Sequence, residues 1–340
     1  MSRTKLAPRC YNTPHVPRKR IDGRRRMTVY VTWSYPGEAN RDVNELDNRF
    51  STMAEVRRVG WPKFETQQYA DWNRFQQGIA GTLEMFFLAW EPFQDLVADV
   101  TGHVVPMYQR VDHAGHQVLL DERVLADTDT LMVFGLDHML TEQEATPGEI
   151  EAVSDFLTRE GSCLVLGPHH DVGVSANLEE RQMEYKHHGD ALVPRQQRFG
   201  KYTRSLMKGL GIPIENRYGL RPAQEKSGGL VVPLNAIRDL DEKGWLKGVS
   251  RFNFHMHLPH YAVTSDDPKA IRVLATQAIN LSKPHPFTEA GNKEFNTFMW
   301  LPPSGKRAGD ILFADSTVFS TLFGVDESLE RFWTNLATIE

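Results

Sequence analysis

Histidine and aspartate side chains gather at a few points of the sequence, most densely in the run His169-His170-Asp171. This run comes two residues after the apolar segment 162–166, which has the composition of a buried strand. In open α/β sheets, ligands bind beyond the carboxyl ends of the strands. We therefore expect His169, His170 and Asp171 to lie at the centre of a candidate site.

A second pair of such side chains, Asp137-His138, follows another apolar segment, 130–134. If the two segments are neighbouring parallel strands, the side chains that follow them converge on one edge of the sheet. Imidazole groups can accept or donate a proton near neutral pH. His138 or His188 is accordingly the predicted acid or base of the site.

Three further histidines, His255, His257 and His260, surround the strand predicted over 252–256. Residues two apart in a strand point to the same face, so His255 and His257 would lie side by side. Two imidazoles on one face with a third nearby predict part of a site for one divalent metal ion, zinc or iron.

A carboxylate could complete this metal site, and Asp171, Glu184 and Asp190 are the candidates. The metal ion would lower the pKa of a bound water to near neutrality and so supply a nucleophile.

Two other interpretations of the histidines stay open. The same side chains could form a polar pocket without a metal, as acid, base or hydrogen-bonding groups for a ligand. They could also be structural, because 13 histidines in 340 residues is only a moderate enrichment and the spacing His-Glu-x-x-His is absent. Glycine-rich phosphate-binding motifs are absent too, so no nucleotide cofactor is expected.

The trio Asp315-Ser316-Thr317 follows a predicted strand at 310–314 and has two interpretations. Ser316 could be a nucleophile or a ligand donor. The pattern more often caps the next helix, and we favour the cap.

The elements that would position these residues begin with a βαβ unit. Thr146, Pro147 and Glu149 are the cap, first-turn proline and capping-box glutamate of a helix that lies between the two strands at 130–134 and 162–166. A strand, a helix and a strand within some forty residues predict a parallel pair.

The remaining pattern extends the same architecture. Val118–Leu120 and 28–33 are strand candidates, and apolar residues at helical spacing predict a helix over about 83–97. Further strands are predicted at 229–234, 252–256, 271–276, 297–301 and 310–314, and helices at 202–210 and 329–336. The predicted fold is α/β, a flavodoxin-like three-layer sandwich with a mainly parallel sheet. We expect one domain over 27–340, with an inserted segment at about 174–228.

Composition places the chain among ordinary globular proteins, with 40% hydrophobic and 24% charged residues. Cys10 and Cys163 are its two cysteines, too few for a disulfide framework, so a cytoplasmic location is expected. No apolar run approaches the length of a membrane span. A small-molecule substrate is the expected partner.

The charge is unevenly distributed. Residues 1–26 contain nine basic residues and one acidic residue, whereas the rest of the chain has a net charge of −13. A basic arm of this kind could bind nucleic acid or lie on an acidic neighbouring subunit. The acidic body has no basic stripe, so nucleic-acid binding is not expected and a homo-oligomer formed through the arm is.

Three segments resemble the class I glutamine amidotransferase-like superfamily, in its noncanonical, trehalose-utilisation-like branch. They are Asp129-Thr-Leu-Met-Val-Phe-Gly135, Cys163-Leu-Val-Leu-Gly-Pro-His-His-Asp171 and Gly309-Asp-Ile-Leu-Phe-Ala-Asp-Ser-Thr-Val-Phe319. The second segment stands where the family has the strand and sharp turn that carry its nucleophile. The family's elbow Gly-x-Cys-x-Gly is absent, and Cys163 begins its strand instead of following it. The resemblance therefore implies the fold, and it does not imply a cysteine-dependent glutaminase.

These observations lead to three functional hypotheses. The first is a hydrolase of a C–N or related polar bond in a small molecule, assisted by a metal ion. The second is a degenerate family member that acts as a binding or assembly subunit, docked through its basic arm. The third is an oxygenase with iron held by histidine and carboxylate ligands.

Overall fold

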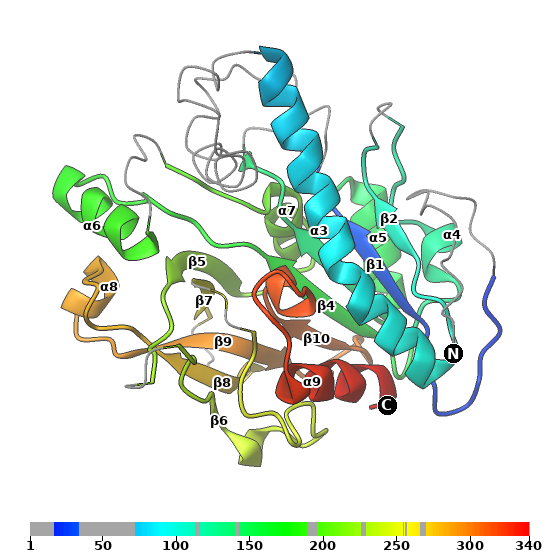
Figure 1. Cartoon of the computed structure of the whole chain (residues 1–340). Coiled ribbons are helices and arrows are strands. Elements are labelled where there is room, and N and C mark those ends of the chain that lie inside the picture. The colour runs from blue at the N-terminus through cyan, green and yellow to red at the C-terminus, as the bar shows by residue number, and fades with distance from the viewer. Residues whose placement is uncertain are drawn as a thin grey trace, which may run out of the picture.

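The computed structural model describes residues 17–33, 72–112, 116–139, 143–189, 196–225, 229–253, 255, 257–265 and 270–339, with the side chains of 72–84 outside this description. An eight-stranded sheet runs through the centre of the molecule, and a smaller two-stranded sheet lies beside it (Figure 1). The predicted α/β class with a mainly parallel sheet is confirmed.

Five strands form the parallel part of the large sheet, in the order β2-β1-β3-β4-β10. They are β1 (Met27–Val31), β2 (Met107–Gln109), β3 (Thr130–Gly135), β4 (Cys163–Pro168) and β10 (Asp310–Phe313). Numbered along the chain, this is the order 2-1-3-4-5 of flavodoxin-like folds. The parallel pairing predicted from the βαβ unit is confirmed for β3 and β4, which pair from Thr130 opposite Cys163 to Gly135 opposite Pro168.

The remaining three strands of the large sheet pair in antiparallel fashion. Strands β9 (Glu294–Leu301), β8 (Arg272–Ala278) and β6 (Asn235–Ala236) extend it beyond β10. Strands β5 (Ile214–Leu220) and β7 (Leu258–Val263) form the separate antiparallel pair.

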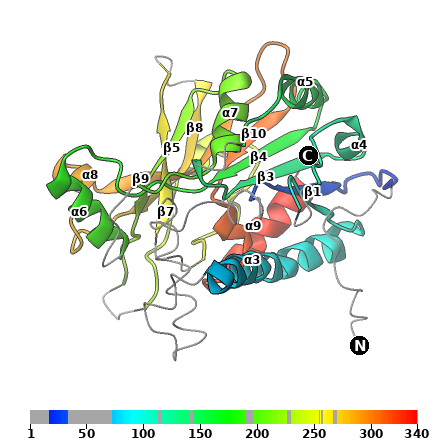
Figure 2. The same ribbon diagram turned by 90° about the horizontal axis from the view of Figure 1, so that it is seen from above.

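Helices cover both faces of the parallel strands, which gives three layers (Figure 2). The long helix α3 (Trp72–Thr101) and the last helix α9 (Glu327–Thr338) pack on one face, and α4 (Glu122–Leu125), α5 (Pro147–Phe156) and α7 (Lys201–Gly209) on the other. Successive residues of β3 alternate between the two cores, Leu131 and Val133 with one and Met132 and Phe134 with the other. Both faces are buried, as the continuous apolar runs predict.

Helix α5 begins as the sequence predicts. The Thr146 side chain accepts a hydrogen bond from the backbone N–H of Glu149, the Glu149 carboxylate accepts one from the N–H of Thr146, and Pro147 occupies the first turn. The capping box is therefore confirmed, and it fixes the start of the helix between the two strands.

The Glu149 side chain in α5 also contacts residues of β1, of α7 and of the segment that follows β2. It forms an ion pair with Arg110 at 3.0 Å, and the Tyr202 hydroxyl in α7 donates to it at 2.9 Å. The hydroxyl of Tyr30 in β1 lies 3.3 Å from the same carboxylate. Burial alone would raise the pKa of Glu149, but Arg110 and the hydrogen bonds from Thr146 and Tyr202 hold this pKa below its usual value.

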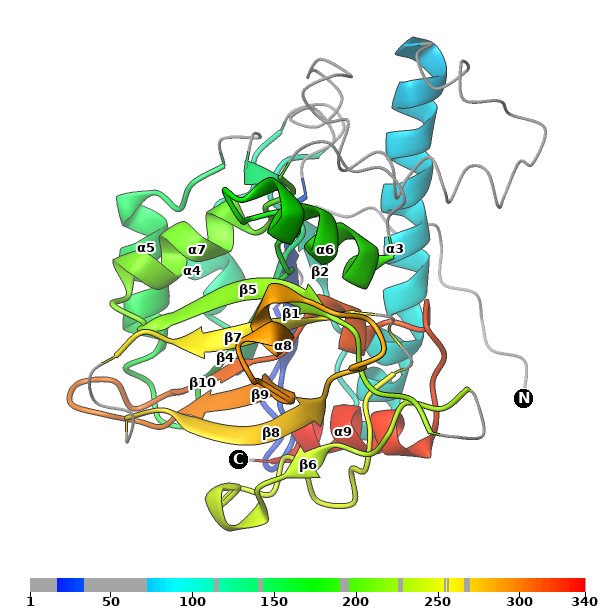
Figure 3. The same cartoon turned by 90° about the vertical axis from the view of Figure 1, so that its left-hand side faces the viewer.

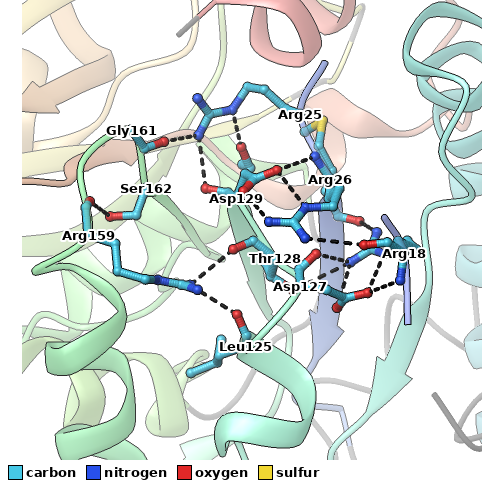
Figure 4. A network of polar contacts seen from close by, with 12 residues as sticks. Arg18, Arg25, Arg26, Leu125, Asp127, Thr128, Asp129, Arg159, Gly161 and Ser162 are labelled. Carbon is cyan, nitrogen blue, oxygen red and sulfur yellow. Dashed lines mark hydrogen bonds and ion pairs between the residues drawn. The ribbon is translucent and has the colours of Figure 1, made fainter. Parts of the chain in front are cut away.

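The described part of the basic arm, residues 17–26, lies on the body of its own chain (Figure 4). The Arg18 guanidinium and backbone N–H contact the Asp127 carboxylate, and Arg26 forms a two-pronged ion pair with Asp129. Arg25 donates to Thr130 at the start of β3 and to the carbonyl oxygens of Asp129, Gly161 and Ile339. These three arginines are thus engaged within the chain, and the role of the arm in assembly stays a prediction.

The predicted insertion over 174–228 contains three elements of the structure. Helix α6 (Leu178–His188) lies with the short helix α8 (Pro286–Glu289) at one side of the molecule, near the two-stranded sheet (Figure 3). Helix α7 belongs to the layer that covers the parallel strands, and β5 pairs with β7. This segment therefore supplies part of the core as well as a covering element.

Three predicted strands are wrong. Residues 118–120, 229–234 and the described part of 252–256 are not in strands. Around His255, backbone N–H groups bond to side chains: the N–H of His255 lies 3.4 Å from Asn253 Oδ1, and the N–H of His257 lies 3.0 Å from Nδ1 of His255. Because these two backbone N–H groups bond to side chains, they make no ladder with a neighbouring strand.

Within the described part of the chain, no helix combines the length and the apolar character needed to cross a membrane.

The buried pair of Glu149 and Arg110 gives a stability prediction. Glu149→Gln leaves the Arg110 guanidinium buried without its counter-charge, and we expect a loss of about 3 kcal/mol in the free energy of unfolding at pH 7. Since the folded pKa lies below the unfolded value of about 4.3, the carboxylate's contribution is present above that value and is lost as the pH falls through the folded pKa. Urea unfolding between pH 3 and 7 measures both effects.

The matched control is Glu151→Gln, which removes an exposed carboxylate from the same helix. It should change the free energy of unfolding by less than about 0.5 kcal/mol. Equal effects of the two substitutions would contradict the assigned role of Glu149.

Candidate functional site

Three adjacent parallel strands end at the same edge of the large sheet, and each is followed by polar residues. Strand β3 leads to Asp137 and His138, β4 leads to His169 and His170, and β10 leads to Asp315. The strands are hydrogen-bonded neighbours in the order β3-β4-β10. The convergence expected from the sequence is thus present in the structure.

Five imidazoles lie close together at this edge and are called here the histidine cluster: His169, His170, His188, His255 and His257. Ring centroids lie 3.9 Å apart for His169 and His170, 4.4 Å for His170 and His257, and 3.7 Å for His188 and His257. His255 packs 4.5 Å from His257. The residues come from the end of β4, the last turn of α6 and the segment before β7.

Three members of the histidine cluster have a geometry that could hold a metal ion. One ring nitrogen from each of His169, His170 and His257 lies within 4.8 Å of the others. Neutral imidazole suits zinc, copper, iron and nickel, and three protein ligands with an open fourth position are typical of catalytic zinc sites. His170 is buried, whereas His169 and His257 keep partial exposure.

The electrostatics at three members of the histidine cluster, His170, His255 and His257, favour neutral rings. Burial lowers the pKa of His255 to about 3, and burial together with the neighbouring imidazoles holds the pKa values of His170 and His257 well below the usual value. A neutral imidazole carries a lone pair on one ring nitrogen, which is the form that ligates a metal ion.

The side chain of Asp315 is the carboxylate that reaches the cluster. It is 2% exposed, its Oδ1 lies 3.3 Å from Nδ1 of His169, and its Oδ2 accepts a hydrogen bond from the Thr317 hydroxyl at 2.5 Å. Burial would raise the pKa of Asp315, but His169 and the hydrogen bonds from His169 and Thr317 hold it below its usual value. Asp315 occupies the N-cap position of the short helix that follows, as the cap prediction places it, but its side chain makes no capping hydrogen bond.

Two of the predicted catalytic residues, His138 and Asp171, contact Phe199, which in turn packs against the histidine cluster. The ring of His138 packs edge-on against Phe199 at 5.7 Å, and the same phenyl ring packs against His169 at 5.3 Å. Asp171 accepts a hydrogen bond from the backbone N–H of Phe199 and forms ion pairs with Arg198 and Arg204. Asp171 therefore holds the segment that carries Phe199.

Two of the predicted metal ligands lie elsewhere. Both oxygens of the Glu184 carboxylate accept hydrogen bonds from backbone N–H groups, those of Val174 at 2.8 Å and Ser175 at 3.0 Å. His260 packs on Phe287, and its Nδ1 accepts from the backbone N–H of Asn296. Among the residues described, the structure does not bring either side chain into the group formed by His169, His170 and His257. Asp190, the other candidate carboxylate, lies outside the described residues.

Gly219 in β5 lets the backbone approach the histidine cluster closely. A Cβ atom at this position would overlap the His170 ring, closer to its Cδ2 than atoms can pack and 2.8 Å from its Nε2. Sequence reasoning missed this residue, because a glycine inside a strand indicates a close approach without naming what approaches.

Gly219→Ala tests whether this packing fixes His170. The added methyl group must displace the ring, and we expect a loss of about 1–3 kcal/mol in the free energy of unfolding, as for overpacked cores. Chemical denaturation measures it, and the His170 ring signals in an NMR spectrum should shift. Gly229→Ala is the control because a Cβ there meets no atom within 4 Å. An unshifted His170 signal in Gly219→Ala would contradict the packing.

Comparisons with known proteins add little to this geometry. No protein-family model matches the sequence, and no curated protein matches it. Among solved structures, the chain is similar to one titled mmIFT52 N-terminal domain, with 9% sequence identity and a TM-score of 0.41 over 74% of this chain and 92% of that chain. A likeness at this level supports no conclusion about function. The resemblance to the glutamine amidotransferase-like superfamily stays a prediction.

Proposed function

We propose that the protein is a metal-dependent hydrolase of a small molecule, with the ion held by His169, His170 and His257. The single observation that carries the proposal is the approach of three imidazole nitrogens to within 4.8 Å of one another at the carboxyl edge of the parallel strands. That edge is where ligands bind in open α/β sheets.

The chemistry of the donor set supports this choice. When bound, a divalent ion would lower the pKa of a water molecule and polarise the bond to be cleaved. The three rings would hold the ion through neutral nitrogens, and the partial exposure of His169 and His257 would leave one side for water and substrate. The choice of a C–N or related polar bond rests on the superfamily resemblance.

The donor set favours a hydrolase over the iron oxygenase. Non-haem iron oxygenases use two histidines and one carboxylate as ligands. Here the third ligand is an imidazole, and the carboxylate of Asp315 contacts His169 Nδ1 instead of joining the group of three. The degenerate-subunit hypothesis has less support, because Arg18, Arg25 and Arg26 of the arm contact their own chain.

The first test is the metal content of the full chain by elemental mass spectrometry. We expect about one zinc or iron ion per chain in the wild type after reconstitution, and loss of the ion in His257→Ala. His260→Ala is the matched control, because His260 is also largely buried but packs on Phe287 outside the histidine cluster. It should retain the ion. No ion in the reconstituted wild type would overturn the metal site.

The second part of the test is activity. Screening amides and related small molecules with the zinc-loaded chain should yield turnover that a chelator abolishes and zinc restores. In His257→Ala this turnover should fall by more than about 100-fold, since even partners of metal ligands are worth 10–100-fold. Turnover that survives complete metal removal would contradict the metal-assisted mechanism and favour the metal-free pocket.

A further inference from the structure

Two of the three proposed ligands have one ring nitrogen engaged by a neighbouring side chain. Nδ1 of His169 lies 3.3 Å from Oδ1 of Asp315, and Nε2 of His170 lies 2.7 Å from Nε2 of His188. A neutral imidazole has one N–H and one lone pair, so a partner at one nitrogen determines what the other nitrogen offers.

For His169 the direction of the hydrogen bond is fixed by chemistry. A carboxylate can only accept, so Nδ1 of His169 carries the hydrogen and Nε2 of the neutral ring carries the lone pair. Asp315 is itself held in place by the hydroxyl of Thr317 and by burial. The ring of His169 is therefore oriented by a group that cannot reverse the hydrogen bond.

For His170 the direction follows from its other nitrogen. Nδ1 of His170 is buried and has no hydrogen-bond partner among the described residues. If His188 were the donor, His170 would carry its hydrogen on Nδ1, as a buried N–H without an acceptor, at a cost of about 1–3 kcal/mol. If His170 donates from Nε2, its Nδ1 offers a lone pair that a metal ion can use.

We propose that Asp315 and His188 are positioning residues that set the tautomers of His169 and His170, so that Nε2 of His169 and Nδ1 of His170 face the metal ion. The assignment of an ion rests on the proposed function, whereas the tautomers are properties of the metal-free chain. Metal-ligating histidines generally donate their other N–H to a carboxylate or another acceptor, and such partners tune affinity.

Helix α6 then has a role at the proposed site. His188 is the last residue of α6, and its backbone carbonyl also accepts a hydrogen bond from Arg221 at 2.9 Å. The inserted segment thereby supplies the acceptor for His170, although it supplies none of the three ligands. Its neighbour His187 faces another partner, because its Nδ1 donates to the carbonyl oxygen of Lys283 at 2.6 Å and its Nε2 accepts from the N–H of Arg221.

The tautomers can be measured directly. In the metal-free full chain labelled with nitrogen-15 at histidine, long-range proton–nitrogen NMR spectra distinguish a protonated from an unprotonated ring nitrogen, and single histidine variants assign the signals. We expect His169 as the Nδ1–H form and His170 as the Nε2–H form. The opposite form at either ring would overturn the inference for that pair, whether or not the protein binds a metal.

Zinc affinity, measured by competition with a chromophoric chelator, tests the consequence at Asp315. Asp315→Asn should weaken binding by about 10–100-fold. The matched control is Asp310→Asn, which removes a buried carboxylate at the other end of β10 that binds Lys243 and Trp300. Both variants should lower the melting temperature, but Asp310→Asn should leave zinc affinity within about threefold. Equal affinity losses would overturn the positioning role.

A second series separates positioning by His188 from direct ligation. His188→Leu removes the acceptor and should weaken zinc binding by about 10–100-fold, whereas His188→Gln keeps an acceptor oxygen and should recover most of the loss. His187→Gln controls for damage to α6. Equal losses in His188→Leu and His188→Gln would overturn the acceptor role. A wild type that binds no zinc but shows the expected tautomers would sink the proposed function alone.

Discussion

The parallel pairing of β3, β4 and β10 is the constraint on which the candidate site depends. Parallel neighbours end at the same edge, so residues 138, 169 and 315, which are far apart in the sequence, must come together once the three strands are in register. The flanking helices fix that register by burying both faces of the strands. A shift of one residue in β4 would exchange the two cores and turn Leu164 and Val165 to the wrong layers.

Burial of the imidazoles is the second constraint, and it follows from the first. A buried charge is costly without a partner; burial and the nearby imidazoles lower the pKa values of His170 and His257, so these rings are held neutral. Neutral rings still need an acceptor, a donor or an ion at each nitrogen. The histidine cluster satisfies some of these needs internally, through Asp315 and His188. The buried Nδ1 atoms of His170 and His257 are the positions that an ion would satisfy.

The sequence predicted the fold better than the site. Continuous apolar strands and the capping box at Thr146 were enough for the βαβ unit, and residues at strand ends gave His169 and His170. The sequence did not predict the role of Asp315. Its local pattern is that of a helix cap, and the contact that its side chain makes is with His169, 146 residues away. Glu184 was misplaced because its backbone partners exist only after the turn at Gly173, where φ is +73°, has formed. Helix α6 was missed because it lacks an apolar stripe that would identify a helix.

The contacts of Arg25 have a consequence for how the molecule can be handled. The Arg25 guanidinium donates hydrogen bonds to Thr130, at the beginning of β3, and to the carbonyl oxygen of Ile339. Ile339, the last described residue of the chain, is therefore held at the edge of the sheet where the parallel strands begin. This edge is at the opposite end of the strands from the histidine cluster. A fluorophore or a surface tether attached there would report on the protein or immobilise it with the histidine edge turned toward solution.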